Sequence, residues 1–147
     1  MAEGFESLVV WQKAHALKLI VHRQVVKLLP PEEKWDLADQ IRRSSKSVCA
    51  NIAEGYGRFY YREAIRFCYN ARGSLCETQN HLIDARDLGY ISEDLYKQAR
   101  DLSEEVYRLL NGYISYLKKR KPGDTEPGHD VCLEVSPAAE LLATGDP

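Results

Sequence analysis

The sequence contains no long run of uncharged apolar residues and none of the short motifs that mark common catalytic sites. A bilayer-spanning helix needs about 20 consecutive apolar residues, and no stretch approaches that length. The patterns Gly-x-x-x-x-Gly-Lys, Gly-x-Ser-x-Gly and His-Glu-x-x-His, which belong to phosphate-binding loops, hydrolases and zinc proteases, are absent. The N-terminus also lacks the basic region followed by an apolar one that marks a secretory signal. We therefore expect a cytoplasmic protein that is not an enzyme.

Metal-binding and disulfide patterns are missing as well. The four cysteines occur singly, without a Cys-x-x-Cys pair, so we expect reduced thiols and no cofactor at Cys49, Cys68, Cys76 and Cys132. His15 and His22, seven residues apart on one helix face, could share a metal or a stacked base. The sequence places no further ligand to complete a coordination shell, so hydrogen-bonded histidines are the favoured interpretation.

The net charge of −2 hides an uneven distribution of charge. Residues 1–121 carry 20 basic and 16 acidic side chains, a net charge of +4, whereas residues 122–147 carry six acids and no Lys or Arg. Residues 122–147 also hold four of the six prolines and show little apolar periodicity. We expect one mildly basic folded domain at residues 1–121 and a disordered acidic tail at residues 122–147.

Four segments show the apolar spacing of three and four residues that indicates amphipathic helices. The first follows Ser7 as its N-cap and ends before Pro30, and the second runs from about Glu32 to Gly55. The third runs from Tyr60 to about Leu88, and the fourth follows Ser92 as its N-cap and ends in the basic run 118–121. Short connections between them predict an all-α, antiparallel up-down-up-down four-helix bundle.

The first helix has a wide apolar face. Its main stripe is predicted to be Val10, Ala14, Leu17, Val21, Val25 and Leu28. Val9, Trp11 and Ile20 fall outside this stripe and would be exposed in a monomer. We therefore expect a homo-oligomer.

The segment 47–58 combines small residues with glycine. Gly55 and Gly57 flank Tyr56, and we expect them to end the second helix near Glu54 through a left-handed turn. Gly73-Ser74 lies inside the third helix, where glycine costs about 1 kcal/mol relative to alanine. We expect a close backbone approach there, against the small face of the second helix.

Basic and aromatic residues surround this turn. Arginines can bind phosphates and exposed aromatics can stack unpaired bases, so the cluster predicts RNA binding. A solvated arginine face, with tyrosines packed between subunits, is the alternative. The candidate RNA-binding residues are Arg42, Arg43, Lys46, Arg58, Arg62 and Arg66, and the aromatics are Tyr56, Phe59, Tyr60 and Tyr61.

Two carboxylates, Glu54 and Glu77, stand beside small residues in these helices. An acid/base or metal-binding pair is one interpretation. The favoured one is structural, because carboxylates at helix ends usually cap amides or pair with arginines, and Arg58 and Arg72 are available.

With these helices and this turn, the chain resembles a bacterial family of four-helix-bundle proteins. The family includes the proteins encoded by intervening sequences in large-subunit ribosomal RNA genes and the accessory variability proteins of diversity-generating retroelements. The resemblance covers residues 5 to about 119, and its blocks are 5–14, 40–45, 47–55 with Gly57-Arg58, 73–77 and 88–90. The motif positions in these blocks include Asn51, Glu54, Gly55, Gly57, Gly73, Ser74 and Glu77.

The resemblance implies a ring-like homopentamer. In the retroelement members it also implies a basic surface that contacts RNA and a reverse transcriptase. Two functions follow as hypotheses for this chain. One is a non-enzymatic RNA-binding accessory protein, for which the resemblance suggests a reverse transcriptase as the partner it assists. The other is a homo-oligomeric protein-interaction scaffold, in which the arginines pair with carboxylates, including those of the acidic tail.

Overall fold

The computed structural model describes residues 4–58 and 60–120. The acidic tail expected at residues 122–147 lies outside the described residues, as does Phe59. The described residues form helices and short helical turns, and no strand occurs among them. No helix in this part of the chain is both long enough and apolar enough to cross a membrane.

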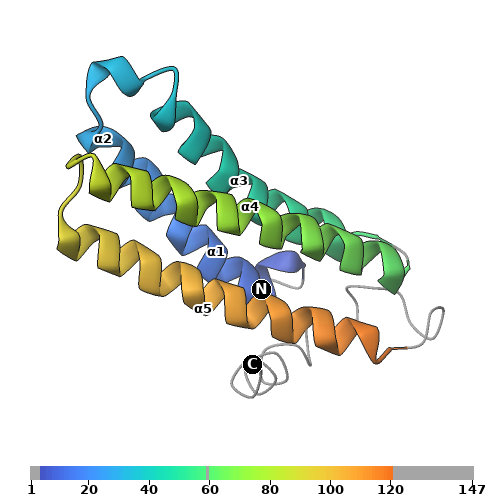
Figure 1. Ribbon diagram of the computed structural model, residues 1–147. Coiled ribbons are helices and arrows are strands. Elements are labelled where there is room, and N and C mark those ends of the chain that lie inside the picture. Colours follow the sequence, from blue (N-terminus) through green and yellow to red (C-terminus); the bar gives the residue numbers. More distant parts are fainter. Residues whose placement is uncertain (1–3, 59, 121–147) are drawn as a thin grey trace.

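Four helical rods run antiparallel, as the sequence predicts (Figure 1). The first rod is continuous and consists of α1 (Val9–Ile20), η2 (Val21–Val25) and α2 (Val26–Leu28). The other three are α3 (Leu37–Tyr56), α4 (Tyr61–Asp87) and α5 (Glu93–Lys118). α1 packs against α3 and α5, and α4 packs against the same two helices. This all-α, up-down-up-down bundle confirms the predicted fold class.

The boundaries of α4 and α5 agree with the sequence prediction. The Ser92 side chain accepts a hydrogen bond of 3.1 Å from the Leu95 amide, which is the expected N-cap of α5. After α4, the chain turns at Gly89 with φ of 80°, the one positive φ among the described residues. Glycine reaches this left-handed conformation without a Cβ clash.

The first rod differs from the prediction at both ends. Its N-cap residue is Leu8, because Ser7 belongs to a preceding 3₁₀ turn, η1 (Phe5–Ser7), and donates its hydroxyl to the Gly4 carbonyl at 2.8 Å. Near the other end, η2 is a π-helix, whose wider turn rotates the following residues relative to an α-helix. Leu28, expected in the core stripe, is therefore 53% exposed.

The three apolar residues expected to be exposed on this rod are partly buried instead. Val9, Trp11 and Ile20 pack against the core of their own chain. They therefore give a weaker reason for oligomerisation than the sequence suggested.

α3 begins later than predicted. Pro31–Glu33 forms a 3₁₀ turn, η3, and α3 starts at Leu37. The Glu33 carboxylate stabilises the start of α3. It accepts a hydrogen bond of 3.2 Å from the Leu37 amide and one of 2.9 Å from the Tyr90 hydroxyl. The expected acid at the helix start is present, but it acts from outside the helix.

The glycines near the turn have other roles than predicted. α3 continues to Tyr56, so Gly55 is helical and buried, and Gly57 ends the helix with a right-handed φ of −80°. A Cβ on Gly55 would lie 3.0 Å from the Phe67 Cβ and 3.1 Å from the Ala64 carbonyl oxygen, so the close approach of α3 and α4 occurs here. A Cβ on Gly73 would meet nothing within 4 Å, and the expected close approach at Gly73 was wrong.

Hydroxyl groups join α3 to α4 farther along the same interface. The Ser47 and Ser74 hydroxyls are 2.8 Å apart, and Thr78 donates to the Ser44 hydroxyl at 2.8 Å. Asn51 donates to both the Ser47 carbonyl and its hydroxyl, at 2.9 and 3.0 Å. The small face of α3 thus meets α4 as expected, with Ser74 rather than Gly73 as the contact.

Candidate nucleic-acid interface

The six predicted RNA-binding residues separate into two groups along the bundle. Arg42, Arg43 and Lys46 lie in the first half of α3, whereas Arg58, Arg62 and Arg66 lie at the α3–α4 turn and the start of α4. The Ser47–Ser74 and Gly55–Phe67 contacts set the antiparallel register of these helices. At 1.5 Å per residue, this register places Arg43 and Arg62 roughly 25 Å apart along the bundle.

Arg58 is held by its own chain. Its Nη2 donates to Glu54 Oε2 at 2.7 Å, and its guanidinium lies 4.7 Å from the centre of the Phe67 ring. Arg66 approaches the same ring at 5.2 Å. The expected pairing of Glu54 with Arg58 is therefore confirmed, and the charge of Arg58 is largely compensated. Arg72, the other expected partner, instead donates to Asn111 Oδ1 at 2.7 Å.

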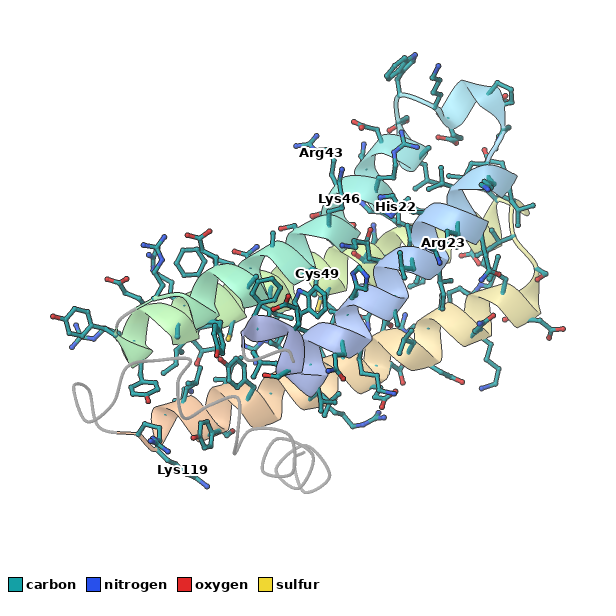
Figure 2. All side chains as sticks on the ribbon, turned by 180° about the vertical axis from the view of Figure 1, so that it is seen from behind. His22, Arg23, Arg43, Lys46, Cys49 and Lys119 are labelled. Carbon is teal, nitrogen blue, oxygen red and sulfur yellow. The ribbon has the colours of Figure 1, made fainter. Side chains whose placement is uncertain are left out.

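Arg43, Lys46 and Arg62 are exposed, and none of them forms an ion pair with any residue in 4–58 or 60–120. Figure 2 shows Arg43 and Lys46 on the same side of the molecule as His22 and Arg23, which come from the first rod. The α3 group is thus extended by cations that the sequence reasoning did not select.

We call this surface the α1–α3 basic patch. Lys18 belongs to it, because it lies one turn before His22 (Figure 2) on the same face of the first rod, where its carbonyl accepts a hydrogen bond of 2.9 Å from His22 Nδ1. The patch consists of Lys18, Arg23, Arg42, Arg43 and Lys46. The sequence signal for it is that residues 7–31 and 40–53 contain no Asp or Glu. That signal becomes meaningful only once α1 and α3 are known to be neighbours.

The electrostatic effect of the patch is visible at His15. Burial lowers the pKa of His15 below 6.5, and the charges of Lys18 and Arg23 lower it further. The imidazole stacks on Trp11, with centroids 4.8 Å apart and planes inclined by 10°. These two cations of the first rod therefore disfavour a charged imidazole at this face.

The aromatic residues expected beside the arginines are mostly not available for stacking. Tyr61 is buried, with 1% of its surface exposed, and Tyr56 is partly buried against the core. Tyr60 is 52% exposed, and Phe59 lies outside the described residues. The predicted alternation of arginines and stacking surfaces at the turn is therefore wrong for Tyr61, and Tyr56 exposes only part of its ring.

Glu54 and Glu77 are not brought together. Glu54 lies near the end of α3, whereas Glu77 lies in the middle of α4 and pairs with His81, with Oε2 and Nε2 3.2 Å apart. Within the described residues, no group of three or more His, Cys, Asp or Glu side chains could hold a metal ion. His22 uses Nδ1 to donate to the Lys18 carbonyl at 2.9 Å, which agrees with the favoured interpretation for His22. The buried Nδ1 of His15 has no hydrogen-bond partner among the described residues, so that interpretation does not hold for this atom.

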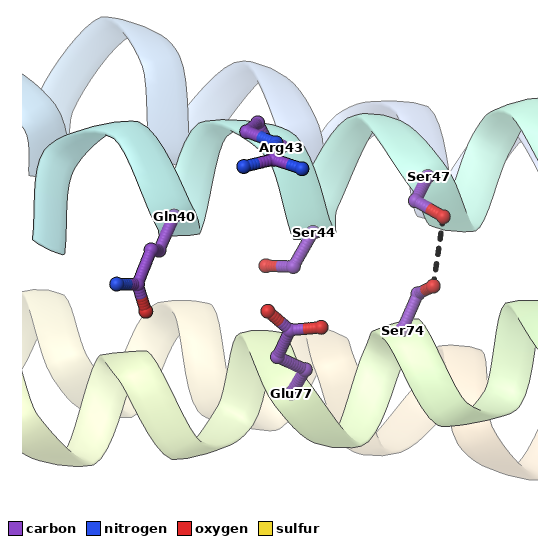
Figure 3. Close-up of a pocket in the computed structure, with 6 residues that line it drawn as sticks. All are labelled: Gln40, Arg43, Ser44, Ser47, Ser74 and Glu77. Carbon is purple, nitrogen blue, oxygen red and sulfur yellow. Dashed lines mark hydrogen bonds between the residues drawn. The ribbon is translucent and has the colours of Figure 1, made fainter. Parts of the chain in front are cut away.

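Glu77 lines a polar groove between α3 and α4 (Figure 3). The groove has a volume of about 470 Å³. Arg43 comes from the α3 side, Glu77 from the α4 side, and the Ser47–Ser74 hydrogen bond closes one end. The motif residues Ser74 and Glu77 thus border the basic patch.

Comparisons with known proteins add a family and a fold relative. The family model described as 23S rRNA-intervening sequence protein matches residues 6–112. A crystal structure of a protein of unknown function from the S23 ribosomal protein family of Bacteroides thetaiotaomicron VPI-5482 is similar, with a TM-score of 0.66 and 25% sequence identity. The match covers 76% of this chain and 100% of the other. No curated protein matches the chain.

Proposed function

The chain belongs to the family of 23S rRNA-intervening sequence proteins, and from this premise we propose that it is a non-enzymatic RNA-binding protein whose α1–α3 basic patch contacts RNA phosphates. Lys18 and Arg23 come from the first rod, and Arg42, Arg43 and Lys46 come from α3. Phosphate contacts need accessible cations without competing carboxylates.

The observation that carries the proposal is the absence of acids from the two segments that supply the cations. Residues 7–31 and 40–53, which form the neighbouring parts of the first rod and α3, contain no Asp or Glu. In contrast, cations elsewhere in the described chain often have carboxylate partners, such as Lys97 with Asp101 at 2.6 Å and Arg100 with Glu104 at 2.9 Å. A run of uncompensated cations attracts a polyanion, and arginine can bind phosphate through two hydrogen bonds.

We propose in addition that the protein is a homo-oligomer, most simply the pentamer that the resemblance implies. Repetition of the patch around a symmetry axis multiplies a modest charge excess into a strong local field. The retroelement relatives add a reverse transcriptase as a partner to test. A reverse-transcriptase gene and a template repeat beside the gene for this chain would support that partnership.

A protein-interaction scaffold is the second candidate function. It is favoured by large apolar side chains at the end of the bundle where η3 and the α4–α5 turn lie (Figure 1). Trp35 is 80% exposed, Leu88 58% and Leu28 53%. Exposed apolar residues gathered at one end of a domain are typical of protein contacts.

The test is binding of a labelled structured RNA over a series of salt concentrations. The variant carries Arg42→Gln and Lys46→Gln. The matched control carries Arg86→Gln and Lys97→Gln, which removes the same charge from cations that have the carboxylate partners Asp87 and Asp101. We expect affinity to fall steeply with salt, and the salt slope to drop by about one for each phosphate contact removed in the variant but not in the control.

Equal losses in the variant and the control would contradict the proposed surface. No measurable binding by the unmodified protein at low salt would contradict RNA binding and leave the scaffold as the function.

A further inference from the structure

A second surface with RNA-binding chemistry lies on the opposite pair of helices, α4 and α5. Two hollows of about 330 and 360 Å³ lie along these helices and share the lining residue Tyr107, and we treat them as one surface groove. We call it the α4–α5 groove. The groove is lined by side chains of both helices, among them Tyr69, Arg72, Tyr107, Arg108 and Lys118. From Arg100 to Lys118 the groove extends for about 27 Å at 1.5 Å per residue.

Two exposed tyrosines stand along this groove. Tyr69 on α4 is 38% exposed, and Tyr107 on α5 is 37% exposed. The Arg72–Asn111 hydrogen bond sets the register of the two helices, and in this register the tyrosines are roughly 10 Å apart along the bundle. Aromatic rings at this separation can each stack a different base of one extended strand.

Cations lie close to the Tyr69 ring. The Arg72 guanidinium lies 4.9 Å and the Lys118 ammonium 5.5 Å from the centre of the Tyr69 ring. Arg72 is fixed from the other side by Asn111. Arg108, near Tyr107, is exposed and has no ion pair with a residue in the described ranges. These cations stand where the phosphates between stacked bases would pass.

The groove carries a clear excess of positive charge. Four cations line it, Arg72, Arg100, Arg108 and Lys118, against the single acid Glu104. Glu104 neutralises Arg100, so three cations remain for an anionic ligand. The combination of alternating cations and exposed aromatic rings is the one that the sequence suggested for the α3–α4 turn, where the structure places Tyr61 in the core.

We propose that the α4–α5 groove binds single-stranded RNA, with unpaired bases stacked on Tyr69 and Tyr107 and phosphates held by Arg72, Arg108 and Lys118. This inference rests on the proposed RNA-binding function and adds a second site with a different ligand preference. A duplex keeps its bases stacked inside and offers only phosphates and groove edges, so it gains nothing from exposed tyrosines. The α1–α3 basic patch has phosphate-binding chemistry and accepts paired or unpaired RNA.

The test uses the full-length chain and an unstructured RNA decamer with a fluorescent 5′ label. The same decamer annealed to its complement serves as the duplex probe. One variant carries Tyr69→Ala and Tyr107→Ala, and its matched control carries Tyr69→Phe and Tyr107→Phe, which keep both rings. Because both side chains are more than one-third exposed, their loss leaves the core intact. Thermal unfolding of both variants checks this point.

We expect the alanine variant to lose about tenfold or more in affinity for the decamer, while the phenylalanine variant stays within about twofold. Duplex affinity should be the same in all three proteins. A decamer with 4-thiouridine should crosslink to the peptides that contain Tyr69 and Tyr107.

The outcomes separate this inference from the proposed function. Undiminished decamer binding by the alanine variant, with loss in the Arg42→Gln, Lys46→Gln variant, would overturn the groove and leave RNA binding at the basic patch. Equal losses of decamer and duplex binding on removal of the tyrosines would also overturn it, because base stacking would not be involved. No binding of any RNA at low salt would overturn both. An acidic peptide that binds the groove in place of RNA would show a protein ligand instead.

Discussion

Gly55 of α3 and Phe67 of α4 approach so closely that a Cβ on the glycine would lie 3.0 Å from the Cβ of the phenylalanine. The Ala64 carbonyl oxygen would be 3.1 Å from the same atom. Both distances are shorter than the van der Waals contacts of a well-packed interior. The absence of a side chain at Gly55 therefore sets how close the two helices can come, and Phe67 in turn positions Arg58 and Arg66.

Gly55→Ala should destabilise the protein by about 1–2 kcal/mol. Overpacking costs about 1–3 kcal/mol, and the better helix propensity of alanine offsets up to about 1 kcal/mol of it. Denaturant unfolding followed by circular dichroism measures the change. A variant as stable as the parent would show that α4 can move away without cost.

Gly73→Ala is the matched substitution on α4 and should have the opposite effect. A Cβ at Gly73 meets no atom within 4 Å, and the residue is exposed inside a helix. The substitution should stabilise the protein by about 0.5–1 kcal/mol, because alanine restricts the unfolded chain and favours the helix. A loss of stability in the same unfolding experiment would reveal a contact at Gly73, such as one with a second copy of the chain.

The cysteines should differ sharply in reactivity towards alkylating reagents. Burial raises the pKa of Cys49 to about 11 and that of Cys68 to about 12, whereas Cys76 is exposed. Near pH 8 the two buried thiols are almost entirely protonated, and the thiolate is the nucleophile. Peptide mapping after brief treatment with iodoacetamide should find Cys76 modified and Cys49 and Cys68 intact, with all three modified in denaturant. Rapid modification of Cys68 in the native protein would contradict its position in the core.

His15 should make the protein more sensitive to mild acid. Its pKa lies below 6.5 in the native state because of burial and the charges of Lys18 and Arg23. The unfolded chain therefore binds a proton more readily, and stability is lost as the pH falls from 6.5 towards the lower native pKa. His15→Gln should remove this part of the pH dependence. An NMR titration of the imidazole in the parent gives the midpoint directly, and a midpoint above 6.5 would contradict the prediction.

Light scattering at micromolar concentration should give the mass of a homo-oligomer, and five chains is the expected number. The apolar side chains exposed at the η3 end, Trp35 above all, give this expectation a structural reason. The partly buried positions of Val9, Trp11 and Ile20 weaken the reason that the sequence gave. Trp35→Ser should weaken assembly if this end forms the subunit contact, and assembly unchanged by the substitution would place the contact elsewhere. A monomer mass would contradict oligomerisation itself.

The fold was predictable where local signals agreed with one another. In α5, regular apolar spacing, an N-cap serine and basic residues at the C-terminal end all indicate the same helix, and the structure confirms it. Gly55 and Gly73 gave the same local signal, a glycine near or inside a helix. The sequence predicted a helix end at Gly55 and a close helix approach at Gly73, but the close approach is at Gly55. The roles depend on which neighbouring side chain faces the glycine, and the spacing within one helix carries no such information.

The candidate site was harder to predict for the same reason. Arg58 and Arg62 are neighbours in the sequence pattern, yet one is paired with Glu54 and the other is exposed without an ion pair to the described residues. Arg23 and Lys46 share a face only because the first rod lies beside α3. Tyr69 and Tyr107 lie on different helices, and only the packing of α4 against α5 places them along the same groove. Charge and exposure at an interface between helices depend on tertiary contacts.

The π-helix in the first rod has a consequence for how this chain tolerates insertions and deletions. A π turn holds about one residue more than an α turn, so Val21–Val25 absorbs an extra residue that elsewhere would rotate everything after it by about 100°. Deletion of one residue from Val21–Val25 would convert the π turn into a regular α-helix, and the core residues before this segment would keep their positions. The same deletion in the middle of α3 would carry Ser47 away from Ser74. An alignment of this chain with its relatives therefore has one natural place for a single-residue gap in the first rod, and that place is η2.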